Sequence, residues 1–156
     1  MLSTAARTIN KVISRFTNLL LIIMTLAVFA QVIFRFVLEQ PLAWSEELSR
    51  YLMIWITFLG ASLAIEKKAH PIIEVAVGVL PGRIRQVVQV IAILSSCVFY
   101  TLLVYFGSQF AVRSFYQLTP AMGLPIGYVY LIIPISGFLL LLSSFAEIEK
   151  ILKRGK

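Results

Sequence analysis

The sequence predicts an all-α integral membrane protein with four transmembrane helices, and three observations predict this fold. The 156 residues are 60% hydrophobic and only 13% charged, with a mean hydropathy of +0.92. The charged share is about half that of a soluble domain. Four apolar segments of membrane length follow one another, and the basic residues gather at alternate connections between them. Because a bilayer excludes open strands, the segments are expected to be helices.

The four predicted spans form one membrane domain that covers residues 1–156. Each is about twenty residues or slightly longer, which at 1.5 Å per residue crosses roughly 30 Å of hydrocarbon. The predicted spans cover residues 16–38, 45–65, 87–110 and 124–145.

The basic residues predict the direction of the chain. Eleven of the fourteen Lys and Arg residues precede the first span, lie between the second and third, or follow the fourth. Positive charge favours the cytoplasmic side, so both termini and the middle connection are expected there. In that connection we assign Lys67, Lys68, Arg83 and Arg85 to topology and to lipid headgroups. The net charge of +7 therefore indicates lipid contact and not nucleic-acid binding.

The middle connection also carries a short apolar stretch from Ile72 to Leu80. This stretch is too short to cross the membrane, and basic residues flank it on both sides. Pro71 suits the first turn of a helix. We therefore predict a short helix that lies along the cytoplasmic interface.

The second span begins with a charged turn, WSEELSRY, over residues 44–51. From Tyr51 to Ile65 only fifteen uncharged residues follow, about 22 Å of helix. The turn must therefore enter the edge of the membrane. Ser45 is the expected N-cap, Glu46 and Glu47 suit a helix N-terminus, and Arg50 is spaced to pair with either acid.

Two interpretations of this turn remain open. One is interfacial anchoring by Trp44, a capped helix and snorkelling charges. The other, which we favour, is a fixed polar contact to another helix or a partner chain, because ionisable groups at membrane depth usually face protein. Arg35 reaches the same depth and could pair with the remaining acid or with Glu39.

A candidate partner surface follows from the helical spacing of the second span. Trp55 and Phe58 lie on the same broad face as Glu47 and Tyr51. Small residues recur at helix-packing spacing elsewhere, and they fit internal packing or a partner surface equally well. These pairs are Gly60 and Ala64, Gly107 and Ala111, and Gly137 and Ser144. Pro134 is expected to kink the last span.

Several of these residues together resemble the small membrane subunit (DctQ-like) of tripartite ATP-independent periplasmic (TRAP) transporters. The matching stretches are FRF at residues 34–36, the charged turn, WITFLGA at 55–61, His70, Glu74 and Leu80-Pro81 in the basic connection, TPAMGLPIGY at 119–128, and Pro134. The resemblance covers roughly residues 20–145. Proline follows His70 in this chain, and Glu74 replaces a common aspartate, so only details of that connection differ.

The resemblance implies a non-catalytic role in the bacterial or archaeal cytoplasmic membrane. In that family a large (DctM-like) membrane subunit moves the substrate, coupled to sodium. A periplasmic binding protein (DctP-like) delivers an organic acid, such as a dicarboxylate or sialic acid. The small subunit supports the large one as a static scaffold.

Two other function classes remain as alternatives, a self-contained four-helix carrier and a four-helix membrane enzyme. A proton-coupled carrier needs a carboxylate within the membrane, and the first span has none. An enzyme needs a polar cluster or a nucleophile with its base, and the spans show neither. One cysteine (Cys97) and one histidine (His70) provide no metal set, and no cofactor is expected.

Overall fold

The computed structural model describes residues 2–66 and 82–154, and all of its regular elements are helices. They are α1 (Leu2–Phe36), α2 (Ala43–Glu66), α4 (Gly82–Ser114), the one-turn α5 (Gly127–Tyr130) and α6 (Ile132–Arg154). The all-α prediction is therefore confirmed for this part of the chain. The predicted interfacial helix at residues 72–80 lies outside the described residues.

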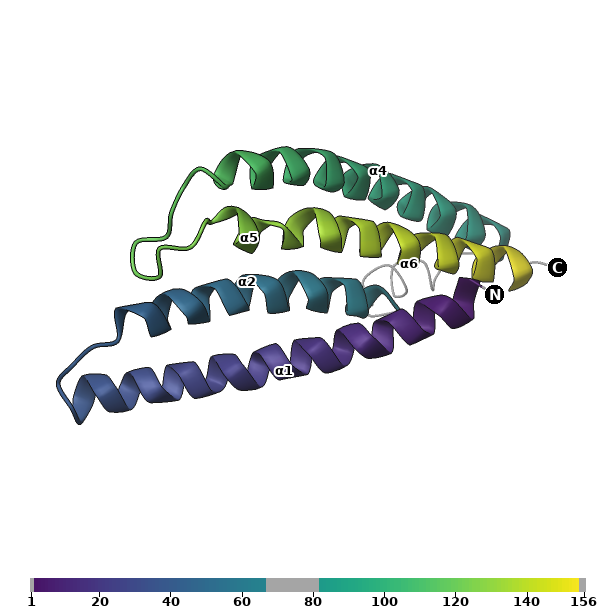
Figure 1. Cartoon of the computed structure of the whole chain (residues 1–156). Coiled ribbons are helices and arrows are strands. Elements are labelled where there is room, and N and C mark those ends of the chain that lie inside the picture. Colours follow the sequence, from purple (N-terminus) through teal and green to yellow (C-terminus); the bar gives the residue numbers. More distant parts are fainter. Residues whose placement is uncertain (1, 67–81, 155–156) are drawn as a thin grey trace.

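The long helices lie side by side in the order α1, α2, α6, α4 (Figure 1). α1 contacts α2 along its length, and α6 packs between α2 and α4. Within the described ranges α4 contacts α5 and α6 but neither α1 nor α2. The two termini lie at one end of this arrangement, and the 37–42 and 115–126 connections lie at the other (Figure 1). We call the latter the loop end.

Three helical stretches of the described chain are long and apolar enough to cross a membrane. They are Thr8–Phe36, Val87–Ser114 and Gly127–Phe145. The predicted second span is also a helix, α2, and it is not one of these three stretches. Its charged residues Glu46, Glu47 and Arg50 lie in its first turns, and an uncharged run follows Arg50.

The core lies where α1, α2 and α6 meet. Leu20, Leu59 and Ile132 are buried and in contact, one from each helix. Partly buried apolar side chains surround this cluster, among them Ile13, Leu52, Trp55, Phe58 and Leu139. The core is therefore formed by the two halves of the chain together.

Glycines allow the close approach of α4 and α6. A Cβ at Gly107 would lie 2.6 Å from the Cγ2 atom of Ile133, and one at Gly137 would lie 2.9 Å from the Cγ2 atom of Val104. The small size of these two glycines thus serves packing between helices within the chain. Gly60 on α2 differs, because an added Cβ would meet nothing within 4 Å.

The predicted fourth span is two helices and not one. α5 ends at Tyr130 and α6 begins at Ile132. Pro134 has no N–H to donate to the carbonyl of Tyr130, and a proline ring crowds that carbonyl. The interruption at Leu131 is the local consequence of this proline.

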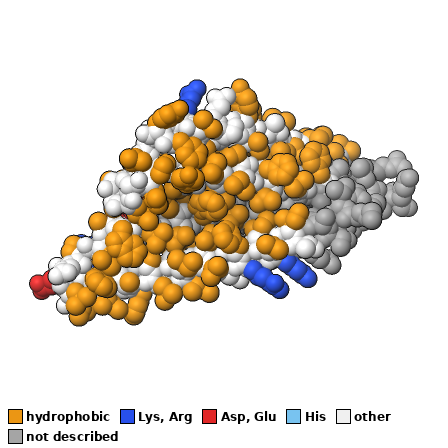
Figure 2. Space-filling model, viewed as in Figure 1, with side chains coloured by type: hydrophobic (Ala, Val, Ile, Leu, Met, Phe, Trp, Pro, Cys, Tyr) orange, Lys and Arg blue, Asp and Glu red, His pale blue; other side chains and the backbone are white. Residues whose placement is uncertain are grey.

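The surface of the molecule is largely apolar. Figure 2 shows hydrophobic side chains across the middle of one face, with the visible charged side chains at its margins. On the outer helix α4, for example, Val98, Phe106 and Val112 are each about three-fifths exposed. Such a surface suits a lipid environment and not water.

Candidate functional site

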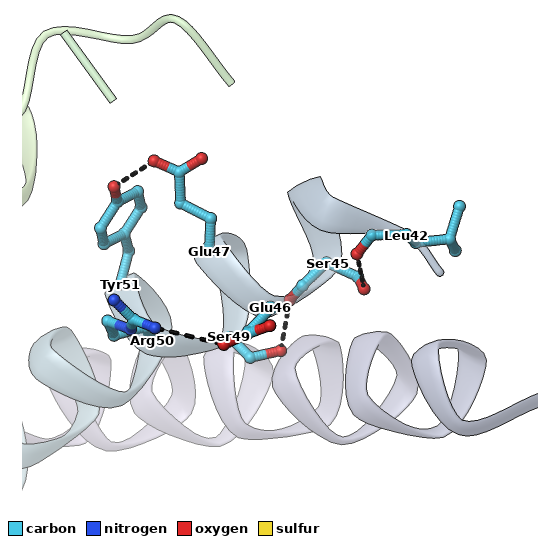
Figure 3. A network of polar contacts seen from close by, with 7 residues as sticks. All are labelled: Leu42, Ser45, Glu46, Glu47, Ser49, Arg50 and Tyr51. Atoms are coloured by element: carbon cyan, nitrogen blue, oxygen red, sulfur yellow. Dashed lines mark hydrogen bonds and ion pairs between the residues drawn. The ribbon is translucent and has the colours of Figure 1, made fainter. Parts of the chain in front are cut away.

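The first turn of α2 differs from the expected cap. The helix begins at Ala43, so Ser45 is its third residue and not its N-cap. The Ser45 hydroxyl donates to the carbonyl of Leu42 at 2.8 Å, and the side chain is fully buried. Ser49 repeats the pattern one turn later and donates to the carbonyl of Ser45 (Figure 3). Both hydroxyls thus bond to backbone carbonyls and cap no N–H group.

The two acids of the turn have separate partners. Arg50 pairs with Glu46 at 3.3 Å, and both side chains are 65% exposed. Glu47 instead is only 6% exposed. It projects from α2 on the side away from α1, together with Tyr51 (Figure 3). The exposed pair and the buried acid therefore face different surroundings.

Glu47 joins α2 to a distant part of the chain. One carboxylate oxygen accepts the hydroxyl hydrogen of Tyr51. The other accepts the backbone N–H groups of Ala121 and Met122, each at 2.9 Å. A carboxylate is an acceptor-only group, and here three donors converge on it. We call this arrangement the Glu47 clamp.

The clamped segment is a hairpin formed by residues 115–126. Leu118 and Pro125 lie opposite each other as an antiparallel pair. The N–H of Thr119 donates to the carbonyl of Leu124 at 2.8 Å, and the Thr119 hydroxyl accepts the N–H of Leu124 at 3.0 Å. Gly123 turns the chain with a φ of 64°, a conformation that favours glycine.

The predicted partner face separates into two parts in the structure. Glu47 and Tyr51 face the hairpin. Trp55 and Phe58 are partly buried and pack against the core, and the Trp55 ring meets Phe16 of α1 edge-on with centroids 6.4 Å apart. All four side chains thus make contacts within the chain.

The remaining predicted residues of the loop end are exposed. Arg35 and Glu39 form no ion pair within the described residues, and the Arg35 guanidinium lies 5.8 Å from the centroid of the Phe36 ring. Trp44 is 45% exposed. These side chains, with the Glu46–Arg50 pair, remain free for contacts outside the chain.

The basic residues predicted to contact lipid headgroups are described only in part. Lys67 and Lys68 lie outside the described residues. Arg83 and Arg85 belong to the first turn of α4, and their side chains are not among those described. In the described ranges no group of three His, Cys, Asp or Glu side chains could hold a metal ion.

Sequence reasoning missed the partners of Glu47. Two prolines and a glycine in TPAMGLP are a signal for a turn, and the buried Thr119 stabilises it. No periodicity connects this turn to an acid that lies 74 residues earlier in the chain. The clamp becomes visible only in three dimensions.

Comparisons with known proteins find one family that matches most of the chain. Residues 24–154 match the family described as "Tripartite ATP-independent periplasmic transporters, DctQ component". The match includes α2, the hairpin and α6, and so the whole Glu47 clamp.

Individual relatives extend this similarity over most of the chain. A Haemophilus influenzae protein, named provisionally as a TRAP transporter small permease protein, is 30% identical over 89% of this chain and 86% of its own length. The ectoine TRAP transporter small permease protein TeaB of Halomonas elongata is 33% identical over 85% of this chain and 72% of its own. The sialic acid TRAP transporter small permease protein SiaQ of Vibrio cholerae is 26% identical over 75% and 66%.

Proposed function

Because the chain belongs to the DctQ family, the small permease subunits of TRAP transporters, we propose that it supports a large membrane subunit as a static scaffold. It is a multi-pass membrane protein of a transport system and not an enzyme. In our proposal the large subunit moves an organic acid together with sodium, and a periplasmic binding protein delivers that acid. The family match over residues 24–154 is the observation that carries this proposal.

The composition of the candidate spans favours the scaffold role over that of a proton-coupled carrier. The three candidate spans contain no Asp or Glu residue. A carrier that couples protons through the membrane requires a carboxylate at depth, and these spans lack one. The substrate class comes from the relatives, whose names refer to sialic acid, C4-dicarboxylates and ectoine.

We further propose that α2 crosses the membrane beside α1, with both termini in the cytoplasm. The helix has 24 residues, about 36 Å in length, which suffices to cross. It lies between α1 and α6, and both contain stretches that are apolar enough to span (Figure 1). The short uncharged run then places the Glu46–Arg50 pair at the outer membrane edge.

The exposed side of α2 is our candidate contact for the large subunit. It carries Glu46, Arg50, Met53 and Thr57, all exposed and spaced one helical turn apart. Charged and hydroxyl-bearing side chains are poorly solvated by lipid, and they gain more from a protein partner. Glu47, Tyr51, Trp55 and Phe58 would then act indirectly, by holding α2 in place.

The direct test is purification of the tagged chain from its native membranes in mild detergent, followed by reconstitution. We expect a large multi-span subunit to co-purify. Proteoliposomes that contain this subunit, sodium and the binding protein should transport the acid only when the present chain is included. Transport by the present chain alone would contradict the scaffold role and favour a self-contained carrier.

A cross-link between the two subunits tests whether the scaffold is static. Cysteine at position 53 (Met53→Cys) in a Cys97→Ser background can be joined to cysteines of the large subunit. A static support predicts that the cross-linked complex still transports. Loss of transport that returns on reduction of the cross-link would show that the two subunits must move relative to each other.

A further inference from the structure

The hairpin at residues 115–126 exposes more apolar surface than a connection in water would. Tyr116 is 91% exposed, Leu118 is 65% exposed and Leu124 is 47% exposed. Candidate spans adjoin the hairpin on both sides, one ending at Ser114 and one beginning at Gly127. The hairpin therefore lies within a few residues of the membrane by its position in the chain.

The Glu47 clamp fixes the position of the hairpin along the length of α2. Its tip bonds to Glu47, one turn inside α2. The α1–α2 connection extends farther out at this end than the hairpin does (Figure 1). The candidate span of α1 reaches Phe36, and the exposed Val37 and Leu38 follow it. The apolar part of α1 thus reaches the level of the hairpin.

The backbone N–H groups at the tip of the hairpin all have acceptors within the chain. Residues 119–126 carry six backbone N–H groups, because positions 120 and 125 are proline. Four of the six find acceptors within residues 117–124, on the carbonyls of Gln117, Thr119 and Leu124 and on the Thr119 hydroxyl. The other two, of Ala121 and Met122, donate to Glu47. Irregular backbone enters a membrane only when such groups are satisfied.

From these observations we propose that the hairpin lies within the interfacial layer of the membrane, with Tyr116, Leu118 and Leu124 in contact with lipid. Glu47 supports this placement, because it accepts the two N–H groups at the tip of the hairpin that find no acceptor within residues 117–124. Tyr116 suits the boundary between headgroups and acyl chains, where aromatic side chains with a polar end are enriched. Arg113, exposed in the last turn of α4, is placed to reach the lipid phosphates.

A spin label at position 118 tests this placement in the full chain. The label is attached through Leu118→Cys in a Cys97→Ser background, and the protein is reconstituted in lipid nanodiscs. Its collision rates with oxygen and with a water-soluble nickel chelate are compared with two references. Phe106→Cys, on the exposed face of α4, represents lipid, and Gln40→Cys, in the α1–α2 connection, represents water.

The proposal predicts that the label at 118 collides more often with oxygen than with the nickel chelate. Its ratio of oxygen to nickel collision rates should lie between the ratios of the two references. Nickel access equal to that at position 40 would overturn it, and the hairpin would then be a docking surface for a soluble protein. Protection from both reagents would also overturn it, in favour of a protein contact.

The role of Glu47 is tested with the same label. Glu47→Ala should raise nickel access at 118, whereas the exposed neighbour Glu46→Ala should leave it unchanged. An unchanged label at 106 verifies that the variant is folded, and Glu47→Gln serves as a milder substitution if it is not. Unchanged nickel access at 118 in a folded Glu47→Ala protein would overturn the role of the clamp.

Discussion

A methyl group added at Gly107 should destabilise the protein, whereas the same addition at Gly60 should not. Both glycines lie inside long helices, so the change in helix propensity is the same. At Gly107 the new Cβ would lie 2.6 Å from the Cγ2 atom of Ile133 and 3.3 Å from its Cβ atom. At Gly60 nothing lies within 4 Å.

The size of the effect follows from this geometry. The Ile133 methyl must move by about 0.8 Å to reach an ordinary contact of 3.4 Å. Rotation of the Ile133 side chain does not move the methyl group away easily, because a β-branched side chain is stiff. The Cδ atom of Pro134 also lies only 3.3 Å from the added Cβ. The helices must therefore separate, and overpacking of this kind costs about 1–3 kcal/mol. Gly60→Ala has no such cost and gains up to about 1 kcal/mol of helix propensity.

The assay is thermal unfolding of the purified chain in detergent, followed by the fluorescence of its two tryptophans. Because the gain in helix propensity is common to both variants, they should differ by the overpacking cost of about 1–3 kcal/mol, which for a chain of this length is roughly 2–12 °C in Tm. Gly60→Ala should melt at or above the wild type, and Gly107→Ala below it. If Gly107→Ala melts as high as Gly60→Ala, the close α4–α6 approach does not exist in the protein.

Three further predictions concern the loop end and the direction of the chain. Glu47→Ala should lower the Tm in detergent, because two backbone N–H groups lose their acceptor. Glu46→Ala breaks only an exposed ion pair and should leave the Tm nearly unchanged. Equal effects of the two substitutions would contradict the Glu47 clamp. Glu39 adopts a φ of 54°, a conformation that costs an L-residue about 1 kcal/mol. Glu39→Gly should therefore raise the Tm by about 2–4 °C. A lower Tm would show that the Glu39 side chain stabilises the connection between α1 and α2. A reporter fused after residue 156 should be active only in the cytoplasm, and periplasmic activity would reverse the proposed topology.

The sequence predicts the helices well because their signal is local. Uninterrupted apolar stretches identify α1, α4 and α6, and Pro134 marks the interruption before α6. The ends are predicted less well. α1 begins at Leu2 and not near Phe16, since a polar, basic stretch can continue a helix beyond the hydrocarbon.

The candidate site is predicted only in part, because its chemistry is not local. The helical spacing predicts that Arg50 pairs with either Glu46 or Glu47, and the structure shows the pair with Glu46. The same spacing cannot say that Glu47 turns away from Arg50, since its partners are backbone groups 74 and 75 residues later. The residue type of Ser45 predicts an N-cap, but the helix begins two residues earlier and the hydroxyl donates to a carbonyl instead.

The position of α6 between α2 and α4 has a consequence for biosynthesis. α4 is made before α6 and after α2, yet within the described residues α4 and α2 do not touch. The donors to Glu47 follow it by 74 residues, which at 5–20 residues per second is about 4–15 s of translation. During that time α1 and α2 form a pair with one end unclamped, and α4 has no helix to join. The last helix, α6, supplies the packing that joins α4 to α2, so a chain truncated before Ile132 should leave α4 without this partner and open to quality-control proteolysis.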